Sequence, residues 1–325
     1  MVKIKPAGLA LDSRDRCLLL NLQKDCRQPL NALARKLKTS KEVVHYRLSR
    51  LVASGVVSRF IADWPPEAAG LCNYVIYFRL EGMPAKSFGE MRRFLAADSR
   101  VAWVGELSGR FDLVVKTYLP DAAELNSFLS SFASRFGKFV RERQVTIRIS
   151  QTYCFAPREL FSEFSPPTAR HSVAVKNAQL DAMDLKILNF IGGNARAPYS
   201  QIAASVAASP ETVKKRLDSL RKRGVVRSLS CWLNVRKLGY SHFKVFLRLQ
   251  YSTVEKLLGV AAWCEEHPKT NFIVTCIGPW DLEIDLVAKN NEEFHAALNE
   301  LRAAFRDSIA EHSWVVINAD WITKA

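Results

Sequence analysis

The feature of this sequence that most constrains its fold is an internal repeat of unusual length. Residues of the first half recur 169 positions later without a gap; four such pairs are Asp12 and Asp181, Pro29 and Pro198, Gly55 and Gly224, and Gly109 and Gly278. A constant offset over so long a stretch indicates a duplicated module rather than the short units of a solenoid. The 325 residues therefore predict one architecture built twice in tandem, with more than one domain overall.

Each copy begins with a pattern of three short helices. Asp12 and its counterpart Asp181 are good helix N-caps, and a second carboxylate three residues later, Asp15 or Asp184, complements the positive end of the helix dipole. A short apolar segment follows an Arg-x-Pro turn and leads into a third helix. Three helices with a tight connection between the second and the third predict a helix-turn-helix domain.

The third helix carries the most regular motif, S-x-x-x-V-x-x-R-L-x-x-L-x-x-x-G-V-V, at 40–57 and again at 209–226. The serine can cap the helix, the apolar positions share one face, and the glycine ends the helix. The opposite, polar face is the one that a major-groove reader presents to DNA. The candidate DNA-binding residues are Ser40, Lys41, Glu42, His45, Tyr46, Arg47, Ser49 and Arg50 in the first copy, and Ser209, Glu211, Thr212, Lys214, Lys215, Arg216, Arg221 and Lys222 in the second. For Arg47 and Arg216, which lie at the edge of the buried face, phosphate positioning or a structural bond is an equal alternative to base reading.

The charge of the chain favours a polyanionic partner. A formal net charge of +15 points to nucleic acid first and to an anionic membrane surface second. Residues 40–58 carry three cations against one anion, net +2, whereas residues 209–227 carry seven against two, net +5. Because attraction to phosphate is the sequence-independent part of DNA affinity, the second copy is predicted to dominate binding to double-stranded DNA.

The second part of each copy has the element order βαββαβ, which is that of a ferredoxin-like domain. The expected fold class is α+β. The predicted boundaries are helix-turn-helix domains at 8–63 and 180–232, ferredoxin-like domains at 70–155 and 239–322, and a linker containing proline and serine at 156–179. A linker of this length reaches about 80 Å when extended, so the two copies can pair within one chain.

Cysteine usage and hydropathy indicate the compartment. The seven cysteines include no C-x-x-C pair, which argues against a disulfide framework or a zinc site and favours a reducing cytoplasm. No segment approaches the ~20 apolar residues of a membrane-spanning helix, and the N-terminus lacks a signal-peptide core. A cytoplasmic, nucleoid-associated protein is expected, with no membrane partner, no metal and no cofactor.

The order of these motifs, present twice, resembles the Lrp/AsnC family of feast/famine transcriptional regulators. The matching features are the L-D-x-x-D start, the Arg-x-Pro turn, the third-helix motif, a closing Leu-Gly or Ala-Gly, and Gly-x-aromatic-Asp in a later hairpin. The resemblance implies sequence-specific DNA binding near promoters, modulation by an amino acid bound between sensor domains, and a homo-oligomer. A subunit of that family usually holds one such unit, so the tandem copy is a departure from the pattern.

The Gly-x-aromatic-Asp hairpins allow two interpretations. The resemblance implies an effector site there, made of Gly109, Arg110, Phe111, Asp112, Gly278, Pro279, Trp280 and Asp281. Turn chemistry alone also explains glycine and aspartate in such a hairpin.

An acidic strip follows the second hairpin. Asp281, Glu283 and Asp285 share one strand face, and the copy-one position equivalent to Asp285 is Lys116. The simplest interpretation is a solvent-exposed face. Because no His or Cys is adjacent, the strip gives little support for a metal site. We favour a third interpretation, in which opposite charges at equivalent positions let copy one pair with copy two as a pseudo-dimer.

The main alternative function is catalytic. Siroheme decarboxylases resemble this family, also occur as fused pairs, and use basic and histidine side chains around a tetrapyrrole. The six histidines of this chain do not recur at equivalent positions, and no catalytic triad, phosphate-binding loop or metal spacing is present in the sequence. We therefore expect a regulator without catalytic residues, with an effector-free architectural DNA-binding protein as the other alternative.

Overall fold

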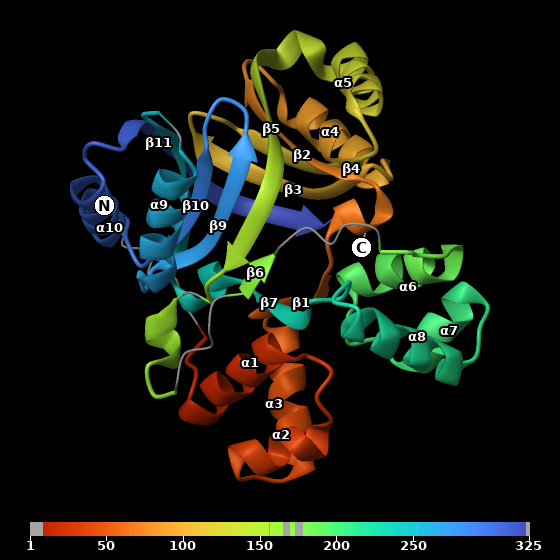
Figure 1. The fold of residues 1–325 in the computed structure, drawn as a ribbon. Helices are drawn as coiled ribbons and strands as arrows, with labels where there is room; N and C mark the ends of the chain where they lie inside the picture. Colours follow the sequence, from red (N-terminus) through yellow and green to blue (C-terminus); the bar gives the residue numbers. More distant parts are fainter. Residues whose placement is uncertain (1–8, 156, 165–169, 173–177, 252, 323–325) are drawn as a thin grey trace.

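A computed structural model describes residues 9–155, 157–164, 170–172, 178–251 and 253–322. In Figure 1 the strands of two α/β domains lie together in the upper part of the molecule, with one helix-turn-helix below them and the other to the lower right. The α+β fold class and the tandem arrangement predicted from the sequence are confirmed.

Each helix-turn-helix consists of three helices followed by a strand. The bounds are α1 Ser13–Lys24, α2 Leu30–Leu37, α3 Lys41–Ala53 and β1 Val57–Asp63 in the first copy, and α6 Ala182–Gly193, α7 Tyr199–Val206, α8 Pro210–Lys222 and β7 Ser228–Leu233 in the second. Asp12 and Asp181 cap the first helices, as predicted, and they also form reciprocal bonds with Asp15 and Asp184, which the sequence analysis did not predict. Gly55 and Gly224 adopt φ values of +74° and +73°, which lets the chain leave the third helix for the strand.

Each α/β domain has the predicted order βαββαβ. The first contains β2 Cys72–Leu80, α4 Ala85–Ala97, β3 Val101–Gly109, β4 Leu113–Leu119, α5 Ala122–Phe136 and β5 Val140–Tyr153; the second contains β8 Ser241–Leu249, α9 Val254–Glu266, β9 Thr270–Ile277, β10 Leu282–Ala288, α10 Asn291–Ala304 and β11 Ile309–Ile322. Short 3₁₀ helices, η1 Pro66–Ala69 and η4 Val235–Leu238, connect each helix-turn-helix to its α/β domain, and a third, η2 Gly137–Phe139, precedes β5.

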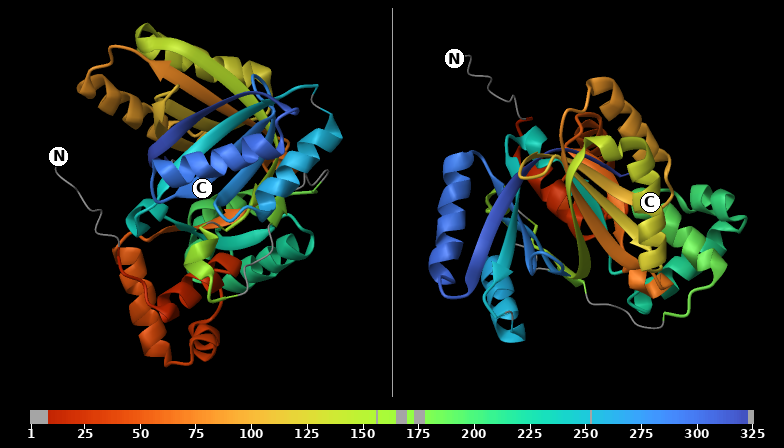
Figure 2. Two further views of the ribbon diagram at one scale, coloured as in Figure 1. Left: turned by 90° about the vertical axis from the view of Figure 1, so that its left-hand side faces the viewer. Right: turned by 90° about the horizontal axis from the view of Figure 1, so that it is seen from above.

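The strands of the two α/β domains close into one eight-stranded barrel. Their order is β2-β4-β3-β11-β8-β10-β9-β5, and β5 also pairs with β2. Two joints of the barrel connect the copies, since β3 pairs with β11 and β5 pairs with β9. Helices α4 and α5 pack against one half and α9 and α10 against the other, all on the outside (Figure 2). The predicted pairing of the two copies within one chain is therefore present, and it removes the free sheet edges that each copy would expose alone.

The last strand of each copy is longer than the sequence predicted. The sequence pattern predicts the last strands at Arg141–Ile149 and Glu311–Ile317, whereas the observed strands β5 and β11 have 14 residues each and extend past both predicted ends. The added residues pair with the other copy, for example Tyr153 with Phe272. A local pattern could not reveal this extension, because the partner that stabilises it lies more than a hundred residues away.

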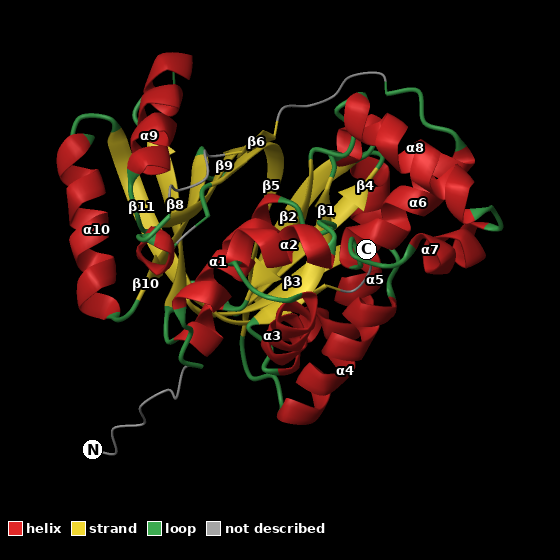
Figure 3. Ribbon diagram, turned by 90° about the horizontal axis from the view of Figure 1, so that it is seen from below, coloured by secondary structure: helices red, strands yellow, loops and turns green. Residues whose placement is uncertain are grey.

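The two helix-turn-helix domains are interlocked through their strands. Strand β1 pairs antiparallel with β7, and the loop after α1 donates from the Cys26 amide to the Leu229 carbonyl at 2.7 Å. The equivalent bond in the other direction runs from the Ala195 amide to the Phe60 carbonyl at 3.0 Å. Figure 3 shows, from below, α1–α3 near the middle of the view and α6–α8 to the right of them. The β1–β7 ribbon thus makes the two domains a single pseudo-two-fold unit.

The segment between the copies is more ordered than a simple linker. Within its described part, η3 Arg158–Phe161 packs on the first helix-turn-helix, with Phe161 buried in that core, and β6 Arg170–Ser172 pairs with β5. The rest of the predicted linker, at 156, 165–169 and 173–177, lies outside the described residues. Among the helices that the structure describes, none combines the length and the apolar character needed to cross a membrane.

Candidate DNA-reading helices and an interior cavity

The third helices of both copies present their polar faces to solvent. Ser40 and Ser209 cap them by accepting from the Val43 and Thr212 amides at 3.3 and 3.1 Å, so these two serines have a structural role. The exposed outer residues are Lys41, Glu42, His45, Tyr46 and Ser49 on α3 and Glu211, Lys214, Lys215, Arg221 and Lys222 on α8, while Thr212 is half-buried. Tyr46 is 67% exposed, which is unusual for a side chain of its size and leaves it available to a partner.

All four arginines on the list of candidate DNA-binding residues are paired with carboxylates of the protein. Arg47 pairs with Asp12 and Asp15 at 2.7 and 2.8 Å, and Arg216 pairs with Asp181 and Asp184 at 2.6 and 2.9 Å. Both arginines therefore make the structural bond that was one of the alternatives left open for them, and a contact of either with DNA stays a prediction. The other two are Arg50, which pairs with Asp15, and Arg221, which pairs with Asp25 of the other copy at 3.1 Å. Arg47, Arg50 and Arg216 thus fix each third helix on the first helix of its own copy, and Arg221 links α8 to the end of α1 in the other copy.

Once the paired arginines are set aside, lysines supply the basic surface of the third helices. On α8, Lys215 pairs only with the exposed Glu211 of the same helix, an interaction that is weak in water. Lys214 and Lys222 have no ion-pair partner among the described residues. On α3 only Lys41 is comparable. The difference in charge between the copies therefore persists after the internal ion pairs are removed.

A reciprocal pair of arginines fixes the two domains to each other. Arg27 donates to the Ala195 and Ala197 carbonyls at 2.8 and 2.9 Å, and its counterpart Arg196 donates to the Cys26 and Gln28 carbonyls. The Arg-x-Pro turn of the sequence is thus a clamp between the copies, and it holds α3 and α8 in one fixed relation.

The Gly-x-aromatic-Asp hairpins are explained by the barrel. Phe111 and Trp280 are buried in its interior, with ring centroids 6.1 Å apart. Asp112 and Asp281 each accept at 2.7 Å from a backbone amide of the neighbouring strand, Leu80 or Leu249. The exposed Arg110 pairs with Glu142, and Pro279 is half-buried.

The glycines of these hairpins permit the close approach of the two copies. A Cβ on Gly109 would lie 3.1 Å from the Trp314 carbonyl oxygen, and one on Gly278 would lie 2.8 Å from that of Val145. Val145 and Trp314 are themselves equivalent positions of the repeat. The turn interpretation therefore accounts for these residues, and the cavity described next includes none of the eight predicted effector residues.

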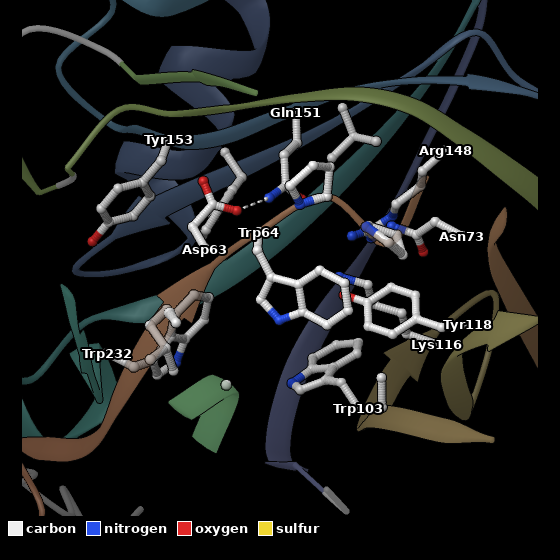
Figure 4. Close-up of a pocket in the computed structure, with 18 of the residues that line it drawn as sticks. Asp63, Trp64, Asn73, Trp103, Lys116, Tyr118, Arg148, Gln151, Tyr153 and Trp232 are labelled. Carbon is white, nitrogen blue, oxygen red and sulfur yellow. Dashed lines mark hydrogen bonds between the residues drawn. The ribbon is translucent and has the colours of Figure 1, made fainter. Parts of the chain in front are cut away.

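A cavity of about 530 Å³ lies at the end of the barrel next to the β1–β7 ribbon. Its volume is in the range of small-molecule sites. Figure 4 shows Trp64 near its centre, Trp103, Tyr118 and Lys116 to one side, and Asn73 beside Arg148. Both copies and both types of domain contribute to its walls.

The copy-two half of the barrel interior contains charged side chains that bind one another. Buried Glu283 accepts from Arg148 at 3.0 Å and from Lys244 at 3.3 Å. Asp285 pairs with Lys244 and, at 3.0 Å, with His242. Burial acts to raise the pKa of both carboxyls, but Lys244 beside Asp285 and Arg148 beside Glu283 outweigh it, so both pKa values lie below their usual range. Lys244 and His242 of copy two, together with Arg148 from β5 of copy one, thus neutralise the carboxylates of this half.

The copy-one half is different at the same repeat positions. Asn73, Val75, Val114 and Lys116 stand where copy two has His242, Lys244, Glu283 and Asp285. Asn73 is 7% exposed, and its Oδ1 has no hydrogen-bond partner among the described residues. Lys116 has no carboxylate partner within the described ranges; its Nζ lies 5.0 Å from the centroid of the Tyr118 ring. Lys116 and Asp285, which carry opposite charges at equivalent positions, therefore both line the cavity. They do not lie opposite each other on neighbouring strands, because β4 and β10 are not paired.

Sequence reasoning found part of this cavity and missed the rest. Glu283, Asp285 and Lys116 stood out by their spacing and charge, whereas Asn73, Trp64 and Arg148 did not. The available signal was the divergence of equivalent strand positions, such as Val75 against Lys244, because an apolar residue replaced by a charged one within a strand marks a changed interior. In the part of the chain that the structure describes, no group of three or more His, Cys, Asp or Glu side chains is placed to hold a metal, and none of the seven cysteines, all of which lie in the described ranges, forms a disulfide.

These observations define a tandem winged helix-turn-helix protein with a closed α/β barrel between its copies. A family model described as winged helix-turn-helix DNA-binding matches residues 11–58 and 180–227. The chain is 32% identical over 126 residues to the HTH-type transcriptional regulator FL11 of Pyrococcus abyssi, covering 39% of this chain and 82% of that protein. It is 34% identical over 61 residues to the regulatory protein AsnC of Haemophilus influenzae, covering 19% of this chain and 41% of that one. The chain belongs to the Lrp/AsnC family, as a tandem duplication of its unit.

Among solved structures, the siroheme decarboxylase NirDL in complex with an iron-uroporphyrin III analogue is similar over nearly the full length. The TM-score is 0.60 at 15% sequence identity, over 95% of this chain and 92% of that one. At this identity the likeness concerns the fold.

Proposed function

We propose that this protein is a sequence-specific DNA-binding transcriptional regulator modulated by a small effector, and that it is not an enzyme. The observation that carries the proposal is the pair of exposed polar faces on α3 and α8, held in a fixed pseudo-two-fold relation by the Arg27 and Arg196 clamp. Two readers in one chain match the two half-sites of a (pseudo)palindromic operator. A DNA-binding regulator acts on the genome, which agrees with the expected cytoplasmic, nucleoid-associated location. Association of the chains into larger oligomers stays a prediction.

The sequence relatives support the same proposal. They are named as transcriptional regulators, and one of them is covered over 82% of its length by this chain. The free lysines on α8 supply the electrostatic part of binding, which does not depend on sequence. Tyr46, His45 and Ser49 on α3 supply hydrogen-bonding groups for base edges or phosphates.

The test is a mobility-shift titration of the intact chain with a pool of random duplexes at graded salt. We expect binding whose logarithm falls linearly with the logarithm of salt concentration, with a slope of about −0.9 for each phosphate neutralised. Absence of binding at modest ionic strength contradicts the proposal.

The second candidate is a siroheme decarboxylase-like enzyme, favoured by the full-length fold match and by the cavity. The charges of the cavity argue against it. Most of the lining cations are held by carboxylates: Arg59 by Asp320, Arg100 by Asp98, Arg148 by Glu283, and Lys244 by Glu283 and Asp285. A tetrapyrrole with many carboxylates would need these cations free. Titration with siroheme distinguishes the candidates, since a shifted Soret band with turnover supports the enzyme and an unchanged spectrum supports the regulator.

A further inference from the structure

We propose that the cavity is a single binding site for a small planar carboxylate that also carries an N–H or O–H donor, and that the site belongs to the copy-one half only. The regulatory consequence of this site rests on the proposed function, whereas the binding itself does not. The site is separate from the two hairpins at which the sequence predicted an effector.

The first step of the argument is the comparison of equivalent positions. A symmetric dimer of one unit would hold two identical half-sites. Here the charged groups of the copy-two half, Glu283, Lys244 and Asp285, are engaged in ion pairs with one another, and breaking these pairs would leave buried charges unpaired. The copy-one half has no such pairs at Val75 and Val114. One ligand per chain follows.

The second step is the chemistry of the open groups. Buried Asn73 presents an oxygen without a partner among the described residues, and a buried acceptor left in that state is costly. A ligand that donates an N–H or O–H to it removes this cost. Lys116 offers a cation that no carboxylate of the described residues neutralises, so it selects an anionic group and favours a carboxylate.

The third step is the size of the ligand. Asn73 faces Tyr118 in the β2–β4 ladder, and Lys116 faces Val75 in the same ladder. Asn73 and Lys116 are therefore diagonal neighbours on adjacent strands, with Cα atoms about 7–8 Å apart. A donor and a carboxylate within a few ångströms of each other in one small molecule can reach both. The rings of Trp64, Trp103 and Tyr118 surround this point, which favours a flat, largely apolar body (Figure 4).

The site is connected to the readers through one carboxylate. Trp103 on the cavity wall donates from Nε1 to Asp320 Oδ2 at 3.2 Å, and Arg59 of the β1–β7 ribbon donates to the same oxygen at 2.8 Å. Movement of Trp103 against a ligand would therefore act on the ribbon that holds the two helix-turn-helix domains together. The ligand can change the DNA affinity only if it binds one arrangement of Trp103, Asp320 and Arg59 more tightly than another.

The test is isothermal titration of the full chain, without DNA, with four planar acids that carry a donor: 2-aminobenzoate, 2-hydroxybenzoate, 3-aminobenzoate and 3-hydroxybenzoate. We expect at least one to bind with a stoichiometry of one per chain and a Kd on the order of 1 mM or below. The neutral isostere 2-aminobenzamide should bind at least about tenfold more weakly than 2-aminobenzoate. Two sites per chain, no binding by any of the four, or equal binding of acid and amide would overturn the proposal.

Variants locate the site. Lys116→Met should weaken binding of the acid about tenfold or more, Lys116→Arg should retain most of it, and the exposed control Lys138→Met should leave it unchanged. Asn73→Asp places a second negative charge beside the ligand and should abolish binding. Circular dichroism and the unfolding midpoint of each variant show whether it is folded. Equal loss of ligand affinity in Lys116→Met and Lys138→Met contradicts the site.

Repeating the titration with DNA bound separates the two proposals, since ligand binding without any change in DNA affinity upholds the site and refutes only its regulatory role.

Discussion

The two copies of this protein share a backbone but differ in what their equivalent residues do. In copy two the strand positions 242, 244, 283 and 285 hold a network of buried ion pairs, and in copy one the same positions are Asn73, Val75, Val114 and Lys116. The readers differ in the same way, since α8 carries several lysines and α3 one. Gene duplication within a chain therefore allows a division of labour that a symmetric homodimer cannot have, because every change in a homodimer appears twice.

The largest expected difference between the copies concerns stability. Lys244→Met removes the cation shared by two buried carboxylates and should lower the free energy of unfolding by about 3–5 kcal/mol. Lys116→Met at the equivalent strand face removes no ion pair and should change it by less than about 1 kcal/mol. Urea denaturation of both variants measures the difference. Equal losses would mean that the two halves are not distinct.

The arginine clamp is the place where the copies should behave alike. Arg27→Ala and Arg196→Ala each remove bonds from a guanidinium to two carbonyls of the other copy, so each should cost about 2–3 kcal/mol. The same denaturation experiment applies, with Arg110→Ala as an exposed control. A large inequality between the two variants would show that the pseudo-two-fold relation is not maintained in solution.

DNA affinity should depend on the copies unequally. Lys214→Ala with Lys215→Ala should reduce affinity about 10- to 100-fold at moderate salt and make the salt slope less steep by roughly 0.9 for each phosphate that is no longer neutralised. Lys41→Ala with His45→Ala on α3 should cost less. The matched control is Lys86→Ala with Lys138→Ala, which removes the same charge from the α/β domain away from both readers. If the α3 and α8 pairs reduce affinity equally, the second copy does not dominate.

The smallest expected effect concerns how the free energy of unfolding changes at acid pH. The pKa values of Glu283 and Asp285 are lowered in the folded state, so the unfolded chain binds protons first and stability falls as pH drops below about 4. Above that pH these groups contribute their full stabilisation. Glu283→Gln removes one of these groups and should reduce the steepest slope by up to about 1.4 kcal/mol per pH unit. An unchanged slope in this variant would show that Glu283 does not titrate as described.

The sequence was sufficient for the fold because local signals and the repeat agree. Caps at Asp12 and Ser40, the third-helix spacing and the βαββαβ order are local patterns, and the offset of 169 doubled each of them. The barrel joints and the cavity were beyond reach, since they depend on which strand edges meet across the chain. The ion pair of Arg50 was not predicted, and the role of Arg47 was left open, for a related reason: a cation on a helix surface looks the same in sequence whether it contacts DNA or a carboxylate of α1.

The most direct test of the account is footprinting of a duplex selected from a random pool by the intact chain. Two readers held by the clamp should protect two half-sites about one helical turn, ~34 Å, apart or a multiple of it, and Lys214→Ala with Lys215→Ala should weaken protection of one half-site first. A single protected segment, or no protection at moderate salt, would contradict the claim that this chain presents two DNA-reading helices in a fixed pair.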